Sequence, residues 1–176
     1  PVATVIRGEG PRGTNAVRCV YMTAGELIGF TITNGHTRTD GEGNGDQNGG
    51  GLSIFPSASV VVSNCVFSGN SAYNAGGSLF GTFYNCVFSG NSAARAGGGV
   101  CSATLHNCVL VGNTATEYGG GTDQSTMNNC TIVGNSAPNG GGVYNGTLNN
   151  CIAYLNVPAN LVFSSCRYTR SDPLPS

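Results

Sequence analysis

The stretch Asn107-Cys108-Val109-Leu110-Val111-Gly112-Asn113 decides the fold, because the chain repeats its pattern five times. The other copies begin at Asn64, Asn85, Asn129 and Asn150, and the last of them is the most divergent. Their cysteines stand at 65, 86, 108, 130 and 151, so the intervals are 21, 22, 22 and 21 residues. A fixed period of this length predicts stacked repeats, each too small to bury its own apolar face.

Each repeat contains two short apolar stretches separated by turn residues. One follows a glycine run, as in Gly97-Gly98-Gly99-Val100, and the other surrounds the cysteine, as in residues 105–110. These stretches lack a 3.6-residue period, which favours strands over helices. The cysteine and the residue two positions later point to the same side of a strand. The sequence therefore predicts an all-β fold, a right-handed parallel β-helix (β-solenoid) of about six coils with 21–22 residues each.

Coils stacked about 4.8 Å apart would align equivalent residues into columns along the axis. We expect an interior cysteine column and an asparagine column whose side chains hydrogen-bond along the axis. The same stacking is expected to explain the asparagine that precedes each cysteine. The expected cysteine column is Cys65, Cys86, Cys108, Cys130 and Cys151, with Cys166 as a sixth member. The expected asparagine column is Asn70, Asn91, Asn113 and Asn135, and the expected apolar interior includes Phe67, Phe88, Leu110 and Ile132.

Two short signatures within the repeats carry a family resemblance. They are Gly98-Gly99-Val100 and the Phe-x-x-Asn motif, present as Phe67-Ser68-Gly69-Asn70 and Phe88-Ser89-Gly90-Asn91. The pair resembles the repeats of chlamydial-type polymorphic outer membrane proteins and, more broadly, the β-helix regions of bacterial secreted and surface proteins. Residues 28–156 carry this resemblance. It implies a β-helix and a secreted, extracellular or cell-surface location, but no particular activity, since this fold hosts adhesins, lyases, glycosidases and passive filaments.

The chain is predicted to form a single domain over residues 1–176. Residues 1–27 would supply an irregular first coil, and residues 28–156 the regular coils, with Phe30 in the first cysteine position. A loop insertion is expected at 36–48. Residues 157–176 would form a short terminal coil and a tail, in which Phe163, Cys166 and Tyr168 keep the repeat spacing.

Composition excludes several partners. Charged residues make up 9% of the chain, lysine is absent and the net charge is −1, which provides no electrostatic footprint for nucleic acid or an anionic membrane. No apolar run is long enough to span a bilayer. The sequence has neither an initiator methionine nor a signal peptide, so Pro1 is expected to be a processed or excised start.

The cysteine column is expected to hold free thiols. Neighbours in a column would have parallel Cβ vectors about 4.8 Å apart, outside the usual disulfide separation of roughly 3.5–4.5 Å. Buried thiols would then act as small apolar fillers. A catalytic or metal-binding column is the alternative, but no base or spaced histidine accompanies it. Cys19 and Cys101 lie outside the column and are the candidates for an exposed or cross-linking thiol.

The inserted loop contains the most concentrated polar chemistry. Asp40, Glu42, Asn44 and Asp46 alternate with glycines, as in the first half of an oxygen-ligand calcium loop. Calcium is therefore the one cofactor that the sequence suggests, although Gly51 stands where a bidentate glutamate would complete such a loop. A solvated acidic loop is the alternative reading.

An enzymatic role has weak support in the sequence. Glu117 and Asp123 form the only carboxylate pair of the regular coils, and Arg95 is the only cation there. Glycoside hydrolysis needs two opposed carboxylates in a cleft, and a lyase needs a basic group. We expect Glu117 and Asp123 to be solvated turn residues, His36 and His106 to lie on the surface, and the chain not to be an enzyme.

Three functions remain open. The first is a structural or adhesive surface solenoid that assembles end to end with itself, or with neighbouring repeats of a longer chain. Its contacts would involve Val5 and Ile6 at one end and Phe163 and Tyr168 at the other. The second is a polysaccharide lyase or glycosidase of the β-helix class. The third is a carbohydrate-binding module whose glycan would stack on tyrosine rings, with the candidates Tyr73, Tyr84, Tyr118 and Tyr144.

Overall fold

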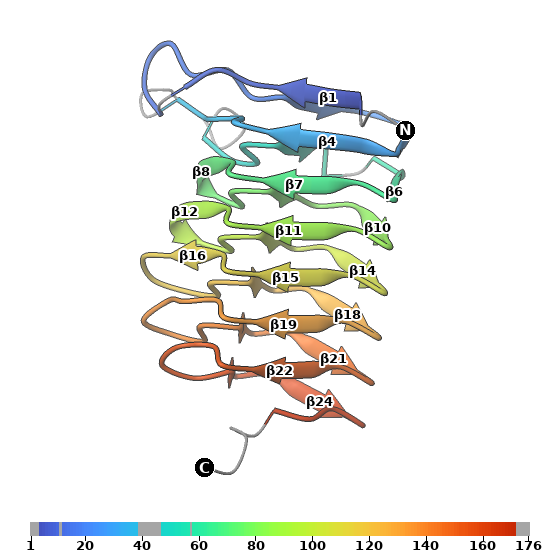
Figure 1. The fold of residues 1–176 in the computed structure, drawn as a ribbon, viewed down its shortest axis with the longest axis vertical. Helices are drawn as coiled ribbons and strands as arrows, with labels where there is room; N and C mark the ends of the chain where they lie inside the picture. Colours follow the sequence, from blue (N-terminus) through green and yellow to red (C-terminus); the bar gives the residue numbers. More distant parts are fainter. Residues whose placement is uncertain (1–3, 11, 39–46, 57, 172–176) are drawn as a thin grey trace.

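The computed structural model describes residues 4–10, 12–38, 47–56 and 58–171, and this part of the chain contains strands but no helix. The chain winds into a β-solenoid in which each coil lies directly below the previous one (Figure 1). In that view the front strands run from right to left and the chain returns behind them one level lower, so the winding is right-handed. The fold class predicted from the sequence is confirmed, with about seven coils in place of about six.

The strands form three seven-stranded parallel sheets and one three-stranded parallel sheet. Sheet 1 contains β1 (Thr4–Arg7), β4 (Phe30–Thr33), β7 (Val66–Ser68), β11 (Val87–Ser89), β15 (Val109–Val111), β19 (Thr131–Val133) and β22 (Ile152–Tyr154). Sheet 2 contains β3 (Gly25–Ile28), β6 (Val60–Ser63), β10 (Thr82–Tyr84), β14 (Thr104–His106), β18 (Thr126–Asn128), β21 (Thr147–Asn149) and β24 (Ser165–Arg167). Sheet 3 contains β2 (Val20–Met22), β5 (Leu52–Ile54), β9 (Ser78–Leu79), β13 (Val100–Cys101), β17 (Thr122–Asp123), β20 (Val143–Tyr144) and β23 (Leu161–Val162). Sheet 4 contains β8 (Ser71–Asn74), β12 (Ser92–Ala96) and β16 (Thr114–Ala115).

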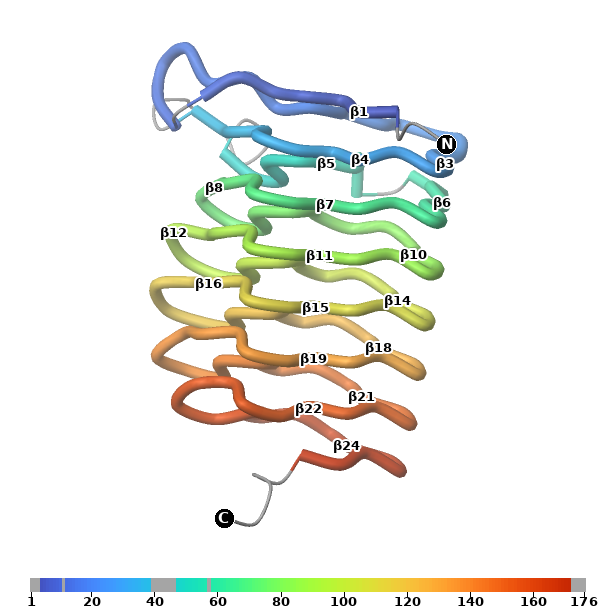
Figure 2. Tube along the Cα trace, viewed as in Figure 1, coloured from blue at the N-terminus to red at the C-terminus, as the bar shows by residue number. Residues whose placement is uncertain are grey.

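A regular coil passes through sheet 2, sheet 1, a wide turn and sheet 3 in that order. The wide turns carry sheet 4 and extend from the body of the solenoid on one side (Figure 2). The register follows the sequence repeat, so that Phe67 pairs with Phe88, Phe88 with Leu110 and Leu110 with Ile132. Each coil therefore corresponds to one copy of the repeat.

The core lies between sheets 1, 2 and 3. It consists of buried side chains that stack on the equivalent side chains of the neighbouring coils. Strands of three residues alternate half-buried, buried and half-buried side chains, as in Val87, Phe88 and Ser89. The ring of Phe88 stacks on Phe67 with centroids 4.8 Å apart, and Phe83 meets both rings edge-on at 5.2 and 5.9 Å. The predicted interior positions Phe67, Phe88, Leu110 and Ile132 are all buried.

Asparagine precedes each cysteine because the backbone turns there. Asn64, Asn85, Asn107, Asn129 and Asn150 link sheet 2 to sheet 1 with φ between 52° and 55°. Asparagine tolerates this left-handed conformation better than most other residues with a side chain. Within the described residues only Asn150 donates its Nδ2 to the equivalent Asn129, at 2.7 Å. Stacking along the axis was therefore the wrong explanation for this position.

The glycine run serves two different needs. Its first member, such as Gly97 with φ of 65°, adopts the left-handed conformation. The next two glycines allow close contact between coils, since a Cβ on Gly98 would lie 2.2 Å from the carbonyl oxygen of Thr114. A Cβ on Gly99 would lie 2.5 Å from the carbonyl oxygen of Gly121.

The last coil departs from the predicted alignment. Thr147 Oγ1 and Ser165 Oγ are hydrogen-bonded across 18 residues, so this coil is shorter than the others. Cys166 consequently pairs with Leu148 on sheet 2 and is exposed, while Thr169 lies below Cys151 and accepts its N–H at 3.4 Å. The assignment of Cys166 to the cysteine column was wrong. Phe163 and Tyr168 are not interior strand residues, because both lie at left-handed turns and are 79% and 80% exposed.

Candidate functional site

The asparagine column is a continuous hydrogen-bonded chain inside the solenoid. Asn91 donates its Nδ2 to Asn113 Oδ1 at 3.0 Å and to the carbonyl of Phe67 at 2.9 Å, and its Oδ1 accepts both the N–H and the Nδ2 of Asn70. The same pattern continues through Asn135 to Asn156, and Asn160 receives the last side-chain donor at 2.9 Å. Every amide in the middle of the column thus has two donors and two acceptors in use.

The column extends beyond the four asparagines named from the regular repeats. Asn156 holds the equivalent position in the fifth, divergent repeat, where the repeat pattern predicts an asparagine of the same stack. Asn160 follows only four residues later, where the last coil shortens, and no periodic signal marks it.

The five regular cysteines lie in the core as free thiols that are 1–2% exposed. Each Sγ is directed at backbone carbonyls, as Cys108 is at His106 (3.3 Å) and Phe83 (3.7 Å). Because the core encloses all five thiols, they act as small apolar fillers and not as accessible nucleophiles.

The cysteines outside the column differ from each other. Cys101 is buried, and its Sγ donates to the carbonyl of Ala96 at 3.4 Å. Burial and the nearby Asp123 raise the pKa of Cys101. The expectation of an exposed thiol at Cys101 was therefore wrong. Cys19 is half-buried and donates to the carbonyl of Thr33 at 3.2 Å, and burial raises its pKa.

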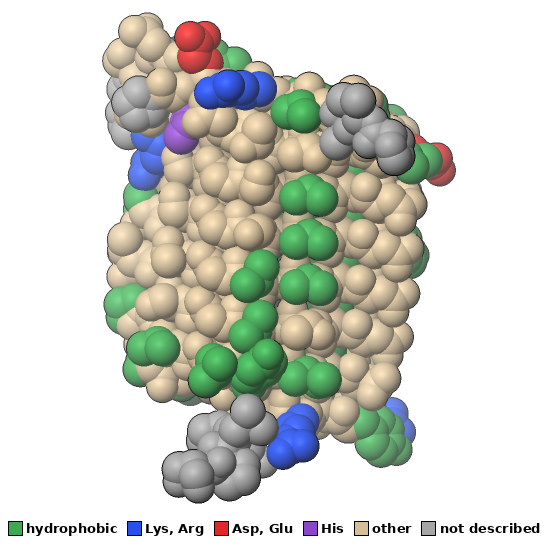
Figure 3. Space-filling model, viewed as in Figure 1, with side chains coloured by type: hydrophobic (Ala, Val, Ile, Leu, Met, Phe, Trp, Pro, Cys, Tyr) green, Lys and Arg blue, Asp and Glu red, His purple; other side chains and the backbone are tan. Residues whose placement is uncertain are grey.

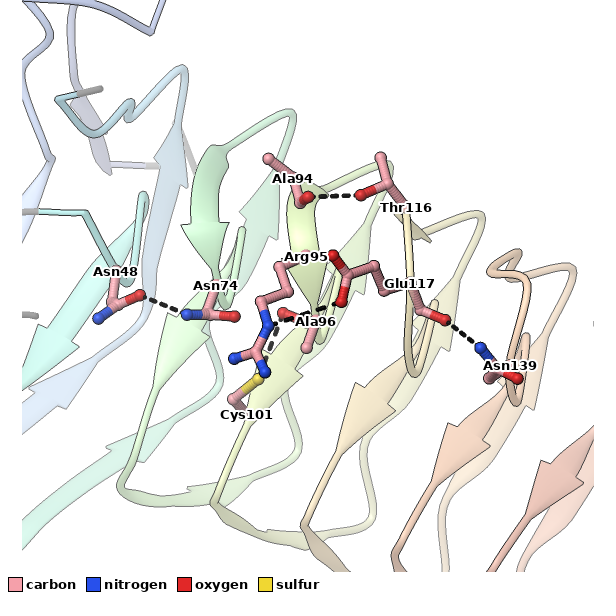
Figure 4. A network of polar contacts seen from close by, with 9 residues as sticks. All are labelled: Asn48, Asn74, Ala94, Arg95, Ala96, Cys101, Thr116, Glu117 and Asn139. Atoms are coloured by element: carbon pink, nitrogen blue, oxygen red, sulfur yellow. Dashed lines mark hydrogen bonds and ion pairs between the residues drawn. The ribbon is translucent and has the colours of Figure 1, made fainter. Parts of the chain in front are cut away.

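A small polar cluster lies where the wide turns meet sheet 3, and Figure 4 shows part of it. Arg95 on β12 forms an ion pair with Glu117, with 3.6 Å between Nε and Oε2, and both side chains are about half exposed. The backbone carbonyl of Glu117 accepts the Nδ2 of Asn139 at 3.1 Å. The cluster is thus anchored to the wide turns of three successive coils.

Asp123 lies close enough to Arg95 for the two charges to interact. It ends β17 in register with Cys101 and Tyr144, is 8% exposed, and its Oδ1 has no hydrogen-bond partner among the described residues. Burial raises the pKa of Asp123 to about 6, and the charge of Arg95 opposes the rise. The expectation that Asp123 is a solvated turn residue was therefore wrong, whereas Glu117 is at the surface as expected.

This arrangement differs from the acid and base pair of a glycosidase. Glu117 is paired with Arg95 at the surface, and Asp123 is buried with little access to a substrate. Glycoside hydrolysis needs two carboxyl groups on opposite sides of the bond that breaks. In the described part of the chain, no three His, Cys, Asp or Glu side chains come together as a metal site. Asp40, Glu42, Asn44 and Asp46 lie outside the described residues, so calcium binding there stays a prediction.

The four tyrosines considered for glycan binding lie on different surfaces. Tyr84 stacks on His106 on the outer face of sheet 2, with centroids 4.8 Å apart and an interplanar angle of 9°. Tyr118 and Tyr144 contact each other beside sheet 3 at 4.7 Å, and Tyr144 meets Phe163 edge-on at 5.6 Å. Tyr73 belongs to β8 in sheet 4.

The outer face of sheet 2 presents two straight columns of polar side chains. The register aligns Thr82, Thr104, Thr126 and Thr147 in one, here named the threonine column. It aligns Tyr84, His106, Asn128 and Asn149 in the other, here named the ring and amide column. Sheet 1 differs, since its outer face carries an apolar stripe visible in Figure 3 that includes Val66, Val87, Val109 and Ile152.

The residues proposed for self-association lie at the two ends of the described stack. Val5 on β1 is 53% exposed, whereas Ile6 packs against the core. β1 pairs only with β4, and β24 pairs only with β21, so each leaves one edge without a partner among the described residues. The described residues form no helix, so none of them forms a membrane-spanning helix.

Comparison with known families agrees with this architecture. Residues 85–103 match the Chlamydia polymorphic membrane protein repeat, and the matched segment covers β11, β12 and β13 with the glycine run. Searches of curated proteins and of solved structures gave no match. The fold and the matched repeat define a parallel β-solenoid built from stacked short repeats. The chain is a β-helix repeat region that resembles the repeats of the polymorphic membrane proteins.

Proposed function

We propose that this chain is a non-catalytic segment of a bacterial surface protein, where it acts as a rigid adhesive rod. One observation carries the proposal: the asparagine column and the core run in unbroken register through the stacked coils. Such a stack transmits force along its axis and presents the same outward positions coil after coil. The matched repeat, whose description names a membrane protein, supports a surface location.

The absence of catalysis is part of the same proposal. Its support is the state of the two carboxylates, because Glu117 is paired with Arg95 and Asp123 is buried. A lyase or glycosidase remains the alternative. Incubation with polyuronates and neutral polysaccharides separates the two, since an enzyme would release unsaturated or reducing sugar ends, and the rod would release none.

Surface location is tested by antibody labelling of intact source cells. Antibodies raised against the 176-residue chain are expected to label intact cells, and protease added outside the cells is expected to remove the label. Label that appears only after the cells are made permeable would contradict the proposal.

End-to-end association is the second element, and the free edge of β1 favours it. Gly8 donates its N–H to Thr33, and N–H groups alternate sides along a parallel strand, so the N–H of Val5 faces away from β4. Such an edge can pair with the last coil of a second copy or with a neighbouring coil of a longer chain. The two ends are different surfaces, so repeated contacts would form an open filament.

Val5→Pro tests this association. Proline removes the outward N–H while leaving the hydrogen bonds toward β4, so the coils are expected to stay folded and filaments to disappear. Val5→Thr keeps the N–H and is the matched control. Filaments of unchanged length in the proline variant would place the contact on the lateral faces, and a wild-type chain that stays monomeric at high concentration would exclude self-association.

A further inference from the structure

The outer face of sheet 2 combines groups that recognise sugars. The hydroxyls of Thr82, Thr104 and Thr126 have no hydrogen-bond partner among the described residues, and their side chains are half-buried and in register. Next to them, Tyr84 is 38% exposed and stacked on His106. The row of free hydroxyls provides hydrogen bonds for sugar hydroxyls. The part of the Tyr84 ring that His106 leaves exposed provides apolar contact for a sugar ring.

The amides of this face are also partly free. Asn149 donates its Nδ2 to Asn128 Oδ1 at 3.0 Å, which holds both amides in a row. An amide carries two donors and two acceptor sites, so this single bond leaves the remaining ones available to a ligand. The ring and amide column is therefore preorganised along the axis, and a ligand that follows the axis would meet side chains already in position.

The charges of this face fit a ligand without cationic groups. From β6 to β24 the outward positions of sheet 2 include no carboxylate, and Arg167 is the permanently charged side chain among them. A nucleic acid would need several phosphate-binding cations, and a basic peptide would need acidic partners. An uncharged ligand rich in hydroxyl groups needs neither cationic nor acidic partners, and it matches the polar atoms that are present.

We propose that the threonine column and the ring and amide column bind a linear, uncharged glycan that lies along the solenoid axis. The threonine hydroxyls recur at every coil, about 4.8 Å apart, so an extended glycan would meet them repeatedly along its length. One sugar would lie against the exposed part of the Tyr84 ring. The inference rests on the proposed adhesive function and names its ligand.

Titration calorimetry with soluble oligosaccharides tests the assignment. The probes are cellohexaose and mannohexaose, with the corresponding disaccharides for comparison, and the protein is the full 176-residue chain. The hexasaccharide of the preferred sugar is expected to bind at least about tenfold more tightly than its disaccharide, because it contacts several coils in place of one or two. Equal affinity for both lengths, or no binding of either hexasaccharide, would overturn the proposal.

Substitutions on neighbouring faces locate the contact. Tyr84→Ala is expected to weaken binding by about tenfold or more, and Thr126→Val by about threefold to tenfold through loss of one hydrogen bond. Thr131→Val, which removes a hydroxyl from the outer face of sheet 1 in the same coil, is the matched control and is expected to leave affinity unchanged. Thermal melting verifies that each variant is folded.

Tyr144→Ala distinguishes the other aromatic surface. Loss of binding in this variant, with Tyr84→Ala unaffected, would move the ligand to the rings beside sheet 3 and refute the proposal.

Antibody labelling of intact cells is independent of sugar binding. Surface labelling without hexasaccharide binding would therefore refute the ligand alone, whereas failure of the labelling would refute the adhesive function as well.

Discussion

The main core and the small second core beside sheet 3 treat buried polar groups in opposite ways. In the main core each asparagine amide meets an identical amide from the next coil, so its donors and acceptors are all paired. In the second core Ala75, Ala96 and Cys101 pack with Leu79 and Tyr118. Asp123 lies beside this core, and the neighbouring coils have Cys101 and Tyr144, not an aspartate, at the equivalent position. Its Oδ1 has no partner among the described residues. A solenoid can bury a polar side chain at little cost when that side chain repeats in register.

Replacing one amide in the middle of the asparagine column is expected to have the largest effect. Asn113→Leu breaks the bonds to Asn91, Asn135 and Phe88 and leaves their polar groups buried without partners. At about 1 kcal/mol or more for each of four hydrogen bonds, the free energy of unfolding should fall by at least about 4 kcal/mol. Urea denaturation measures this loss.

The control for this prediction is Asn128→Leu on the outer face of sheet 2. Its side chain is half-buried, and its Oδ1 accepts one bond from Asn149, so a change of at most about 1 kcal/mol is expected. Similar losses for the inner and outer asparagines would mean that the column contributes no more than ordinary surface amides.

The apolar part of the main core is tested by Phe88→Ala. The ring is fully buried between Phe67 and Phe83, and its removal leaves a cavity in a stack that cannot collapse without shifting neighbouring coils. The expected loss is about 3–5 kcal/mol in the free energy of unfolding. A loss below about 1 kcal/mol would show that the coils close around the gap, contrary to a rigidly packed core.

The repeat made the main core predictable from sequence. A side chain that recurs at 21–22-residue intervals must lie at the same place in every coil, which correctly placed Phe67, Phe88 and the five regular cysteines inside. Periodicity gives no information about residues that occur once. The burial of Asp123 depends on the wide turns that cover the outer face of sheet 3, and no sequence pattern indicates that cover.

Spacing misled the prediction where the coil length changed. Cys166 seemed to continue the cysteine column, but a coil of 18 residues places Thr169 there. The left-handed turns are a similar case, since an asparagine before each cysteine fits both a hydrogen-bonded stack and a corner of positive φ. Both explanations predict the same residue at the same spacing, so only the backbone conformation in the structure distinguishes the corner from the stack.

The second core is tested by the pH dependence of stability. The folded pKa of Asp123 is about 6 against an ordinary value of 3.8, so the folded chain retains a proton that the unfolded chain has already released. This group therefore stabilises the fold below about pH 4, and its contribution is lost as the pH rises through about 6. Allowing for partial contact with solvent, the decrease between about pH 4 and pH 7 should be about 1–2 kcal/mol.

Asp123→Asn should remove this decrease, because an amide does not titrate. Urea denaturation of both proteins across this pH range gives the difference, in which other titrating groups cancel. Glu117→Gln changes the exposed carboxylate of the same cluster and is expected to leave the decrease in place. A wild-type chain and an Asp123→Asn variant with parallel stability profiles would mean that Asp123 is ionised and well solvated in the folded protein.

The smallest expected effect concerns a turn where the repeat itself has changed. Gly69, Gly90, Gly112 and Gly134 follow successive strands of sheet 1 with φ of 61° to 63°, and Leu155 takes the same place in the next coil with φ of 54°. A Cβ on Gly134 would meet no atom within 4 Å, so glycine is favoured here by the backbone conformation and not by a lack of space. The left-handed conformation costs a residue with a Cβ about 1–2 kcal/mol. Leu155→Gly should therefore stabilise the fold by about 1 kcal/mol, since part of the gain is offset by the greater freedom of glycine in the unfolded chain.

Gly134→Leu is the reciprocal variant and should destabilise the fold by a similar amount. Thermal melting and urea denaturation measure both, and a stability loss on Leu155→Gly would mean that the exposed leucine makes apolar contacts worth more than the strain of its turn.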